Sequence, residues 1–474
     1  MHPGLARVVA LQQAAFHEAQ GVAAPQLDRL VARALTPDDV RNAVLRDAPL
    51  LAHRRGPARP DIAEAREELA AVGLIDATPD DLAFRRLFPT LDDGVYCASH
   101  ATGKPSIAWA SALEAHLSHL RQWGLGAWEA GWVDAEARVR ERVATLVGGD
   151  PEAGAVARYL NVSDALSAIL NGGLRGRLVT AEDHFTTAHY IHEAWANQTG
   201  SEVVEVAEAR DGSAPLAALC DALTRDTEVV SVATASWRTG VLLDVYALSE
   251  AIMDICPDAT LIVDAYQTLG TVPLHTDRLA MRTAVLGGGL KQLRAGTGAG
   301  FAWISHPLLD ELEPDRTGWF GHIAPFAFAP PPMVRGQGAT KLQTGCPDPT
   351  GALALAVELD VLASVAGGSL EAAVRRTRAT TAQQVRTAIA LAEHHGLQVV
   401  GDVPPEARAA FFAIRVPDGA IVADLAREGL VADFRADIPG GKAGVCRISA
   451  NAASFDYELA AVVDGLAQRM GVRA

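Results

Sequence analysis

Short apolar runs alternate with helical patterns over residues 96–325. Six of the runs have the length and composition of β-strands, at residues 177–180, 203–206, 229–234, 260–265, 283–286 and 301–304. Between two of them, apolar side chains recur at helical spacing, at Val245, Leu248, Ile252 and Ile255. This alternation predicts βαβ units around a mostly parallel sheet. Ligands of such sheets bind at the carboxyl ends of the strands, so polar residues that follow each run are the first candidates for function.

The two ends of the chain have other patterns. The first ninety residues predict several short helices, two of which begin with a Thr N-cap before a proline, at Thr36 and Thr78. After the proline-rich residues 329–332, a long helical stretch over 350–395 precedes short strands at 398–400, 411–416, 431–434 and 445–448. We therefore predict a helical N-terminal extension over 1–90, a large domain over 91–330 and a small C-terminal α+β domain over 331–474.

Composition narrows the class of protein and of partner. The 474 residues are 49% hydrophobic and 21% charged, which is typical of an ordinary globular protein of two or three domains. The net charge of −16 argues against nucleic acid or an anionic membrane surface as the main partner. No apolar run approaches the ~18 residues of a membrane span, and the first residues do not resemble an export signal. The sequence therefore predicts a protein that is neither exported nor anchored and that acts on a small substrate.

The cysteines indicate the compartment in which the protein acts. They are scattered singly, without the paired spacing of a zinc site, and they are too few for a disulfide framework: Cys97, Cys220, Cys256, Cys346 and Cys446. We expect a reducing cytoplasm and no metal.

One lysine and one aspartate carry the strongest chemical signal. Lys291 follows the glycines 287–289, where backbone and ligand can approach closely, although a solvated lysine in a flexible turn has the same pattern. Asp264 ends an apolar run 27 residues earlier, so its carboxylate is expected at the carboxyl edge of the sheet. The pair suits pyridoxal phosphate, which needs a lysine that bonds to it and an acid beside its pyridine nitrogen. A glycine-rich dinucleotide motif is missing after the first strand, and the one at 296–300 precedes a strand.

Five segments in this order resemble a known family. They are residues 96–103, 183–190, 263–267, 290–291 and 318–322. The chain resembles the class V aminotransferase group of fold-type I pyridoxal-phosphate enzymes, and within it the kynureninases, over residues 96–455. The resemblance implies an α/β fold with a mostly parallel seven-stranded sheet in a large cofactor-binding domain and a small C-terminal domain.

The resemblance also implies which residues bind the cofactor. Lys291 would bond to it, Asp264 would pair with its pyridine nitrogen and Phe185 would stack on its ring. Val162 and Ser163 fall where the family binds the phosphate, at the start of a predicted helix whose backbone N–H groups suit an anion. An ordinary helix cap has the same residue types.

Four further residues are expected at the substrate. Arg447 stands where related enzymes hold the amino-acid carboxylate, and a planar guanidinium can pair with both oxygens. A surface arginine on an edge strand is the alternative. Trp319 and His322 belong to the most kynureninase-like segment, which faces the substrate, and Trp319 is also expected at the cofactor. His322 could equally be a satisfied pocket histidine, and His100 belongs to the family's first segment.

Several positions depart from the kynureninase pattern. Gln267 replaces a histidine and is similar to the glutamine that bonds the cofactor's phenolic oxygen in cysteine desulfurases. Leu290 replaces a tyrosine beside the lysine, and Arg238 replaces a phosphate-binding tyrosine for which its charge could compensate. Cys346 stands near the cofactor where other residues are usual. Cys346 and Cys446 also make desulfurase chemistry an option, because that reaction needs a cysteine nucleophile. Neither has the expected Gly-His-His-Cys context, and both could be small buried apolar residues.

The residues and the resemblance together favour a pyridoxal-phosphate enzyme acting on an amino acid. The favoured reaction is hydrolytic Cβ–Cγ cleavage of an aryl-bearing 2-amino-4-oxo acid, of which kynurenine is the type. Transamination and β- or γ-elimination are alternatives on the same scaffold, and a catalytically inactive binding protein is a third possibility. The family also implies a homodimer. The unmatched first ninety residues could be a partner-docking module.

Overall fold

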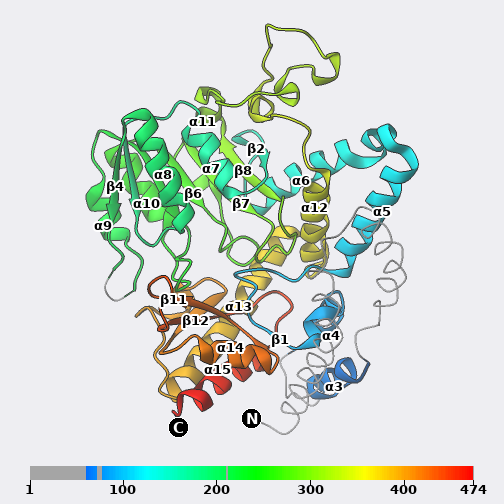
Figure 1. The fold of residues 1–474 in the computed structure, drawn as a ribbon, viewed down its shortest axis with the longest axis vertical. Coiled ribbons are helices and arrows are strands. Elements are labelled where there is room, and N and C mark those ends of the chain that lie inside the picture. The colour runs from blue at the N-terminus through cyan, green and yellow to red at the C-terminus, as the bar shows by residue number, and fades with distance from the viewer. Residues whose placement is uncertain (1–59, 72–76, 210–211, 473–474) are drawn as a thin grey trace.

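The computed structural model describes residues 60–71, 77–209 and 212–472 and is built around a seven-stranded sheet (Figure 1). In spatial order its strands are β2 (Gly154–Tyr159), β8 (Gly300–Ser305), β7 (Thr283–Gly288), β6 (Thr260–Asp264), β5 (Thr227–Ala233), β3 (Arg177–Ala181) and β4 (Glu202–Val206). Only β8 runs antiparallel to its neighbours, β2 and β7. The predicted α/β fold with a mostly parallel seven-stranded sheet is confirmed.

Helices cover both faces of this sheet. On β6, Leu261 and Val263 share a core cluster with Leu248 and Ile252, whereas Ile262 between them belongs to a second cluster on the opposite face. The first face is covered by α6 (Val133–Leu146), α9 (Leu216–Ala222), α10 (Val245–Ile255) and α12 (Pro349–Ser364). The second is covered by α7 (Val162–Leu170), α8 (Thr186–Thr199) and α11 (His306–Glu311). Burial on both faces explains why the strands read as continuous apolar runs.

A smaller antiparallel sheet lies below the large one in Figure 1 and has its own core. Its strands are β11 (Asp433–Ala436), β12 (Gly444–Ser449) and β9 (Phe411–Val416), in that order. Helices α13 (Leu370–His394), α14 (Ala420–Arg427) and α15 (Asp456–Met470) pack with it. Two residues of β1 (Val95–Tyr96) pair with β10 (Leu430–Val431), which links the start of the large domain to the small one.

The structure differs from the predicted elements at several places. The helical stretch over 350–395 is two helices, because Gly367 and Gly368 break it at φ values of +64° and +95°. Residues 398–400 form only an isolated bridge, from Val399 to Ile414, before Gly401 turns the chain at φ +87°. The run at 431–434 is divided between β10 and β11.

Strand β2 was missed, since Arg158 and small residues interrupt its apolar pattern. No helix within residues 60–71, 77–209 and 212–472 is long and apolar enough to cross a membrane.

The described part of the N-terminal region is helical, as predicted, with α3 (Pro60–Ala71) and α4 (Pro79–Arg85). Thr78 caps α4 by accepting a hydrogen bond from the Asp81 N–H at 3.2 Å, while the cap predicted at Thr36 lies outside the described residues. The exposed helix α5 (Ile107–Trp123) follows. The domain boundaries at residues 90 and 330 stay a prediction. Helix α12, beyond the second of them, shares its core with the large sheet.

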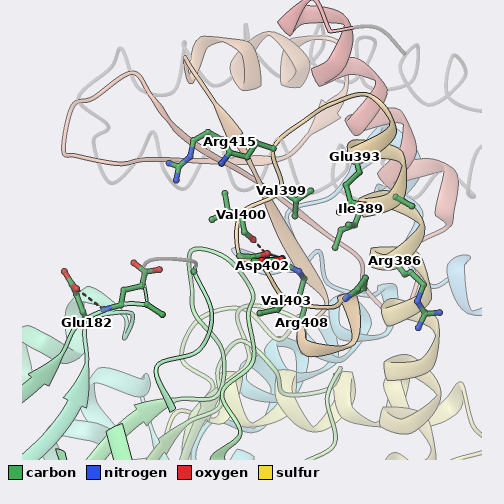
Figure 2. Close-up of a pocket in the computed structure, with 17 residues that line it drawn as sticks. Glu182, Arg386, Ile389, Glu393, Val399, Val400, Asp402, Val403, Arg408 and Arg415 are labelled. Carbon is green, nitrogen blue, oxygen red and sulfur yellow. Dashed lines mark hydrogen bonds between the residues drawn. The ribbon is translucent and has the colours of Figure 1, made fainter. Parts of the chain in front are cut away.

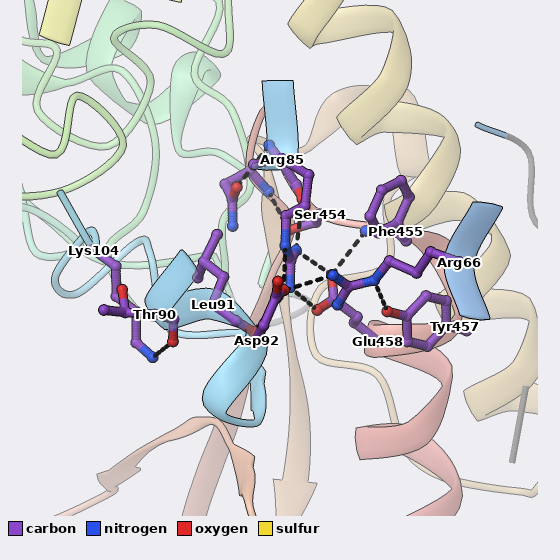
Figure 3. Close-up of polar contacts among 12 residues, drawn as sticks. Arg66, Arg85, Thr90, Leu91, Asp92, Lys104, Ser454, Phe455, Tyr457 and Glu458 are labelled. Carbon is purple, nitrogen blue, oxygen red and sulfur yellow. Dashed lines mark hydrogen bonds and ion pairs between the residues drawn. The ribbon is translucent and has the colours of Figure 1, made fainter. Parts of the chain in front are cut away.

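A buried network of ion pairs joins α3 and α4 to the start of α15 (Figure 3). The Arg85 guanidinium donates to both carboxylate oxygens of Glu458, at 3.0 and 2.9 Å, and its Nε donates to Asp92 at 3.1 Å. Arg66 donates to the same Asp92 oxygen at 2.5 Å and to the Tyr457 hydroxyl at 2.9 Å. The charged side chains are at most 3% exposed. Residues preceding position 90 are therefore part of the small domain's packing.

Candidate active site

A cavity of about 320 Å³ opens at the carboxyl ends of the large sheet's strands and reaches the small domain. It collects eight residues that the sequence predicts at the cofactor or substrate: His100, Val162, Ser163, Phe185, Asp264, Gln267, Lys291 and Arg447. These come from the end of β6, from the segments that follow β1, β3, β6 and β7, from the start of helix α7 after β2, and from strand β12. Residues that are far apart in the sequence therefore meet in one site, at the sheet edge where α/β proteins bind ligands.

Lys291 lies three residues after β7 and faces two aromatic rings. Its Nζ is 4.5 Å from the ring centre of Tyr266 and 5.7 Å from that of Phe185. The Gln267 amide satisfies both of its neighbours when its oxygen accepts from Lys291 Nζ at 3.0 Å and its nitrogen donates to the His100 carbonyl at 3.2 Å. Burial lowers the pKa of Lys291 to about 8, although the negative charge of Asp264 acts to raise it. The alternative of a solvated surface lysine is wrong.

The backbone before Lys291 is held by a close approach of the chain at Gly103. The Gly103 N–H donates to the Leu290 carbonyl at 2.8 Å. A Cβ atom at residue 103 would lie 2.1 Å from the Lys291 carbonyl oxygen, which no side chain permits. The segment that follows β1 therefore packs against the turn that carries Lys291, and β1 itself pairs with β10 of the small domain.

Asp264 is the last residue of β6, so its carboxylate emerges into the cavity as the apolar run predicts. One carboxylate oxygen accepts the Tyr266 N–H at 2.9 Å. Burial raises the pKa of Asp264, while this hydrogen bond and the charge of Lys291 act in the opposite direction. A carboxylate here is suited to pair with a protonated ring nitrogen. That positive charge would compensate for the water that the buried carboxylate has lost.

The start of α7 forms the end of the cavity suited to an anion. Asn161 caps this nine-residue helix by accepting from the Asp164 N–H at 2.9 Å, and Val162 and Ser163 are its first two residues. The first N–H groups of a helix have no partner within it and carry partial positive charge. With Val162 and Ser163 lining the cavity, this helix end fits a phosphate.

Arg447 lies at the end that belongs to the small domain and is only 2% exposed, so it is not a surface arginine. Its Nε donates to Asp433 at 2.7 Å, its Nη2 donates to the same carboxylate oxygen, and its Nη1 donates to the Trp237 carbonyl. The neighbouring His100 ring stacks on Phe411 at 4.7 Å between ring centres. Burial lowers the pKa of His100 to about 3, so the ring is neutral at ordinary pH.

Four predicted site residues do not line this cavity. Arg238 pairs with Asp437 at 2.8 Å, and Cys346 is exposed and lines a separate cavity of about 200 Å³. His322 accepts the Ala324 N–H at 2.9 Å through its ring nitrogen. Trp319 belongs to a cluster of aromatic rings with Trp128, Phe320, Phe326 and Phe328, hereafter the aromatic cluster. Within one chain these residues are thus apart from Lys291.

The residues that line the cavity and that the sequence interpretation missed include Tyr266, Trp237, Arg435 and Thr187. Tyr266 and Thr187 lie inside two of the recognised segments, which was a signal for both. Trp237 follows β5 and directly precedes Arg238, a predicted site residue, so its position was also a signal. Arg435 gave none, because it lies on β11 and reaches the cavity through the docking of the two domains.

A second, larger cavity of about 850 Å³ lies between the large sheet and α13 (Figure 2). Its described lining carries arginines and carboxylates but no lysine, histidine or cysteine. Arg408, the most buried of its arginines, donates to the backbone carbonyls of Val400 and Gly401, at 2.9 and 2.5 Å. None of the predicted site residues lines it, so the cavity at Lys291 is the candidate active site.

Comparison with known proteins identifies the family. The family model for class-V aminotransferases matches residues 112–428, about two thirds of the chain. The chain belongs to the class V aminotransferase family. It is 27% identical over 378 residues to kynureninase of Pseudomonas fluorescens, covering 76% of this chain and 86% of that protein. It is 29% identical over 384 residues to kynureninase of Deinococcus radiodurans, covering 78% and 89%.

Other relatives have different activities. Isopenicillin N epimerase of Streptomyces clavuligerus is 29% identical over 346 residues, which cover 69% of this chain and 83% of that protein. Among solved structures, a mutant of C-DES with glycine linked to its pyridoxal-phosphate cofactor has a TM-score of 0.71 at 17% identity, covering 81% and 98%. Apo cysteine desulfurase from Thermococcus onnurineus has a TM-score of 0.69 at 18% identity, covering 83% and 97%. The structural likenesses establish the fold alone.

The predicted kynureninase-like family resemblance is confirmed, and the cofactor is pyridoxal phosphate. The residues present fit this group, because one cavity holds a buried lysine, a carboxylate, an exposed aromatic face at Phe185 and a helix N-terminus. The chain is therefore a pyridoxal-phosphate-dependent enzyme of this family.

Proposed function

We propose that the protein is a cytoplasmic homodimer that cleaves the Cβ–Cγ bond of an aryl-bearing 2-amino-4-oxo acid by hydrolysis, as in the conversion of kynurenine to anthranilate and alanine. The observation that carries the proposal is the grouping of Lys291, Asp264 and Arg447 in one cavity. Relatives named kynureninase, which align with about three quarters of the chain, support it.

The cavity assigns a separate task to each of these side chains. Bound pyridoxal phosphate supplies an electron sink for the charge left when a bond to the substrate's α-carbon breaks. Lys291 would hold the cofactor and then, once its amine is free, take the α-proton, for which a pKa of about 8 is well suited. Asp264 would hold the proton on the ring nitrogen. Gln267, in contact with Lys291 Nζ, would orient that amine.

The remaining walls suit an amino acid with an aromatic side chain. Arg447 would bind the α-carboxylate, while the rings of Phe185, Trp237 and Tyr266 form apolar surface beside Lys291. Val162 and Ser163 would hold the phosphate. The aromatic cluster offers a second stacking surface if a neighbouring subunit brings it to the cavity.

The proposal is tested with a panel of aryl-bearing 2-amino-4-oxo acids, including kynurenine, by measuring alanine and the aryl product. We expect alanine release from at least one member, with kynurenine itself turned over slowly, because Gln267 and Leu290 replace the histidine and tyrosine of kynureninases. Alanine release from no member, together with a cofactor absorbance that responds to amino acids, would contradict the proposed reaction. An absorbance that never responds would indicate an inactive binding protein.

Elimination of a sulfur side chain is the second candidate, because Gln267 contacts Lys291 where a histidine would be expected. Release of pyruvate and sulfide from cysteine or cystine would favour it. A desulfurase that forms a persulfide on its own cysteine is less well supported. No cysteine among the described residues lines the cavity; Cys446 is fully buried on β12 and Cys346 lines another cavity.

Large apolar side chains at the surface support the homodimer. In the aromatic cluster, Phe326 and Phe328 are 56% and 71% exposed, and Trp123 at the end of α5 is 57% exposed. Exposed apolar side chains that gather on a surface mark an interaction site. We propose that a second copy of the chain covers the aromatic cluster and that Trp319, His322 and Cys346 complete the neighbouring subunit's site.

Sedimentation tests this assembly. We expect a species of about twice 49.8 kDa, and we expect Phe328→Asp to shift it toward monomer and to lower turnover together. Met281→Asp, which also charges a 71% exposed apolar side chain outside the aromatic cluster, is the control and should sediment as the parent does. A fully active parent monomer of 49.8 kDa would exclude the shared site.

A further inference from the structure

We propose that Asp433 determines the charge at the substrate end of the cavity and restricts the site to amino acids with a single carboxylate. The inference rests on the proposed function, because it takes Arg447 to bind the α-carboxylate. It concerns which residue limits the number of carboxylates that a substrate can carry.

Asp433 and Arg447 form a cross-strand pair. They are register partners in the antiparallel pairing of β11 with β12. The Nε and Nη2 atoms of Arg447 both donate to one Asp433 oxygen, and Nη1 donates to the Trp237 carbonyl. Three of the five guanidinium N–H groups are thus engaged, which leaves one on each terminal nitrogen. A carboxylate can accept from that pair, so Asp433 holds Arg447 ready for one carboxylate and does not block it.

A second arginine shares the same aspartate. Arg435 lies two residues beyond Asp433 on β11, on the same face of the strand, and its Nη2 is 3.2 Å from the other Asp433 oxygen. Its side chain is 44% exposed and lines the cavity. Asp433 therefore stands between two guanidinium groups and cancels one of their two charges.

The other groups around Asp433 leave this balance unchanged at ordinary pH. His100 Nε2 is 3.7 Å from Asp433, and its pKa of about 3 keeps the ring neutral. His100 and Arg447 lower the pKa of Asp433 to about 2, against the effect of burial, so its carboxylate stays charged. The two arginines and the aspartate together carry one net positive charge, which a single substrate carboxylate neutralises.

A second carboxylate on the substrate would reach Arg435, which lines the cavity but is already paired with Asp433, and would bring its charge close to that of Asp433. Like charges placed together at a binding site weaken binding, whereas an unpaired guanidinium would attract the second carboxylate. Converting Asp433 to a neutral residue should therefore have a large effect on the preference between substrates with one and two carboxylates. Its effect on the average affinity should be smaller.

The experiment compares acid and amide pairs of nearly equal size, aspartate with asparagine and glutamate with glutamine. Their affinities for the holoenzyme are read from the absorbance of the bound cofactor, without turnover. In the parent we expect the amide to bind about tenfold or more tightly than the acid. In Asp433→Asn we expect this ratio to shift about tenfold or more toward the acid. The ratio is insensitive to a general loosening of Arg447, because that loss is common to both members of a pair.

Two further variants fix the interpretation. Asp437→Asn is the matched control, because Asp437 also accepts from two arginines, Arg238 and Arg415, neither of which lines the cavity. It should keep the parent ratio. Arg435→Ala removes a 44% exposed side chain that lines the cavity, and it should move the ratio further toward the amide.

The outcomes separate the two proposals. If Asp433→Asn and Arg435→Ala both keep the parent ratio while Arg447→Ala weakens every amino acid, the inference about Asp433 is wrong and the proposed site stands. If Arg447→Ala weakens none of them, carboxylate binding at this end of the cavity is wrong, and the inference fails with it. Should Asp433→Asn not fold, an unchanged ratio in Arg435→Ala is by itself sufficient to reject the inference.

Discussion

The Lys291→Ala variant is expected to lose covalently held cofactor and nearly all turnover while keeping its fold. Lys291 Nζ is the amine that faces Phe185 and Gln267 inside the cavity, and we assign it both the attachment of the cofactor and the transfer of the α-proton. Loss of a general base alone costs ~10²–10⁴-fold in rate. Borohydride reduction of the parent followed by peptide mapping should place the label on Lys291, and the variant should take up none.

Lys104 provides a matched control for this result. Burial also lowers its pKa to about 8, and its Nζ donates to the Thr90 carbonyl at 2.6 Å, but it does not line the cavity. Lys104→Ala should therefore retain the label and the cofactor's absorbance. A label found on Lys104, or on any other lysine, would remove Lys291 from its assigned role.

Glu458→Gln is expected to lower the free energy of unfolding by about 3–5 kcal/mol, because it leaves a buried arginine without one of its partners. In the parent, Arg85 and Arg66 are balanced by Glu458 and Asp92 in the network of Figure 3. The variant leaves one uncompensated positive charge among side chains that are almost fully buried. Denaturant unfolding followed by circular dichroism measures the effect.

Glu371→Gln is the control for the loss of an ion pair at the surface. Glu371 pairs with Arg375 one turn along α13, and both side chains are more than half exposed. Such pairs contribute ~0–1 kcal/mol. If Glu458→Gln destabilises the protein no more than Glu371→Gln does, the network does not hold α4 to α15. A clear difference would show that residues preceding position 90 are part of the folded enzyme.

The sheet and the two central residues could be predicted because each has its own local signal. Six strands read as apolar runs, since they are buried on both faces, and Asp264 stands where one of these runs ends. Lys291 follows glycines that allow a tight approach of the chain. Strand β2 has no comparable run, because Arg158 interrupts it and its strand conformation depends on pairing with β8.

The phosphate end of the site was also accessible from the sequence. Asn161 and the apolar helix that follows it form a helix start that can be recognised without the fold. The position of this helix start beside Lys291 could not be predicted from a local pattern, because it depends on how the strands are ordered in the sheet. The family resemblance supplied the order of the segments, but it could not show that Trp319 and Cys346 lie apart from Lys291 within one chain.

The pattern along the chain was sufficient to predict the kinds of element, because burial of one face repeats with the period of a helix or strand. It was also sufficient for the residues that directly follow a strand. The surroundings of Arg447 depend on tertiary structure: Asp433 is 14 residues away across a strand pair, and the Trp237 carbonyl is 210 residues away in the other domain. Strand register and domain docking decide such contacts, and neither has a local signature, because both result from packing between segments that are distant in the sequence.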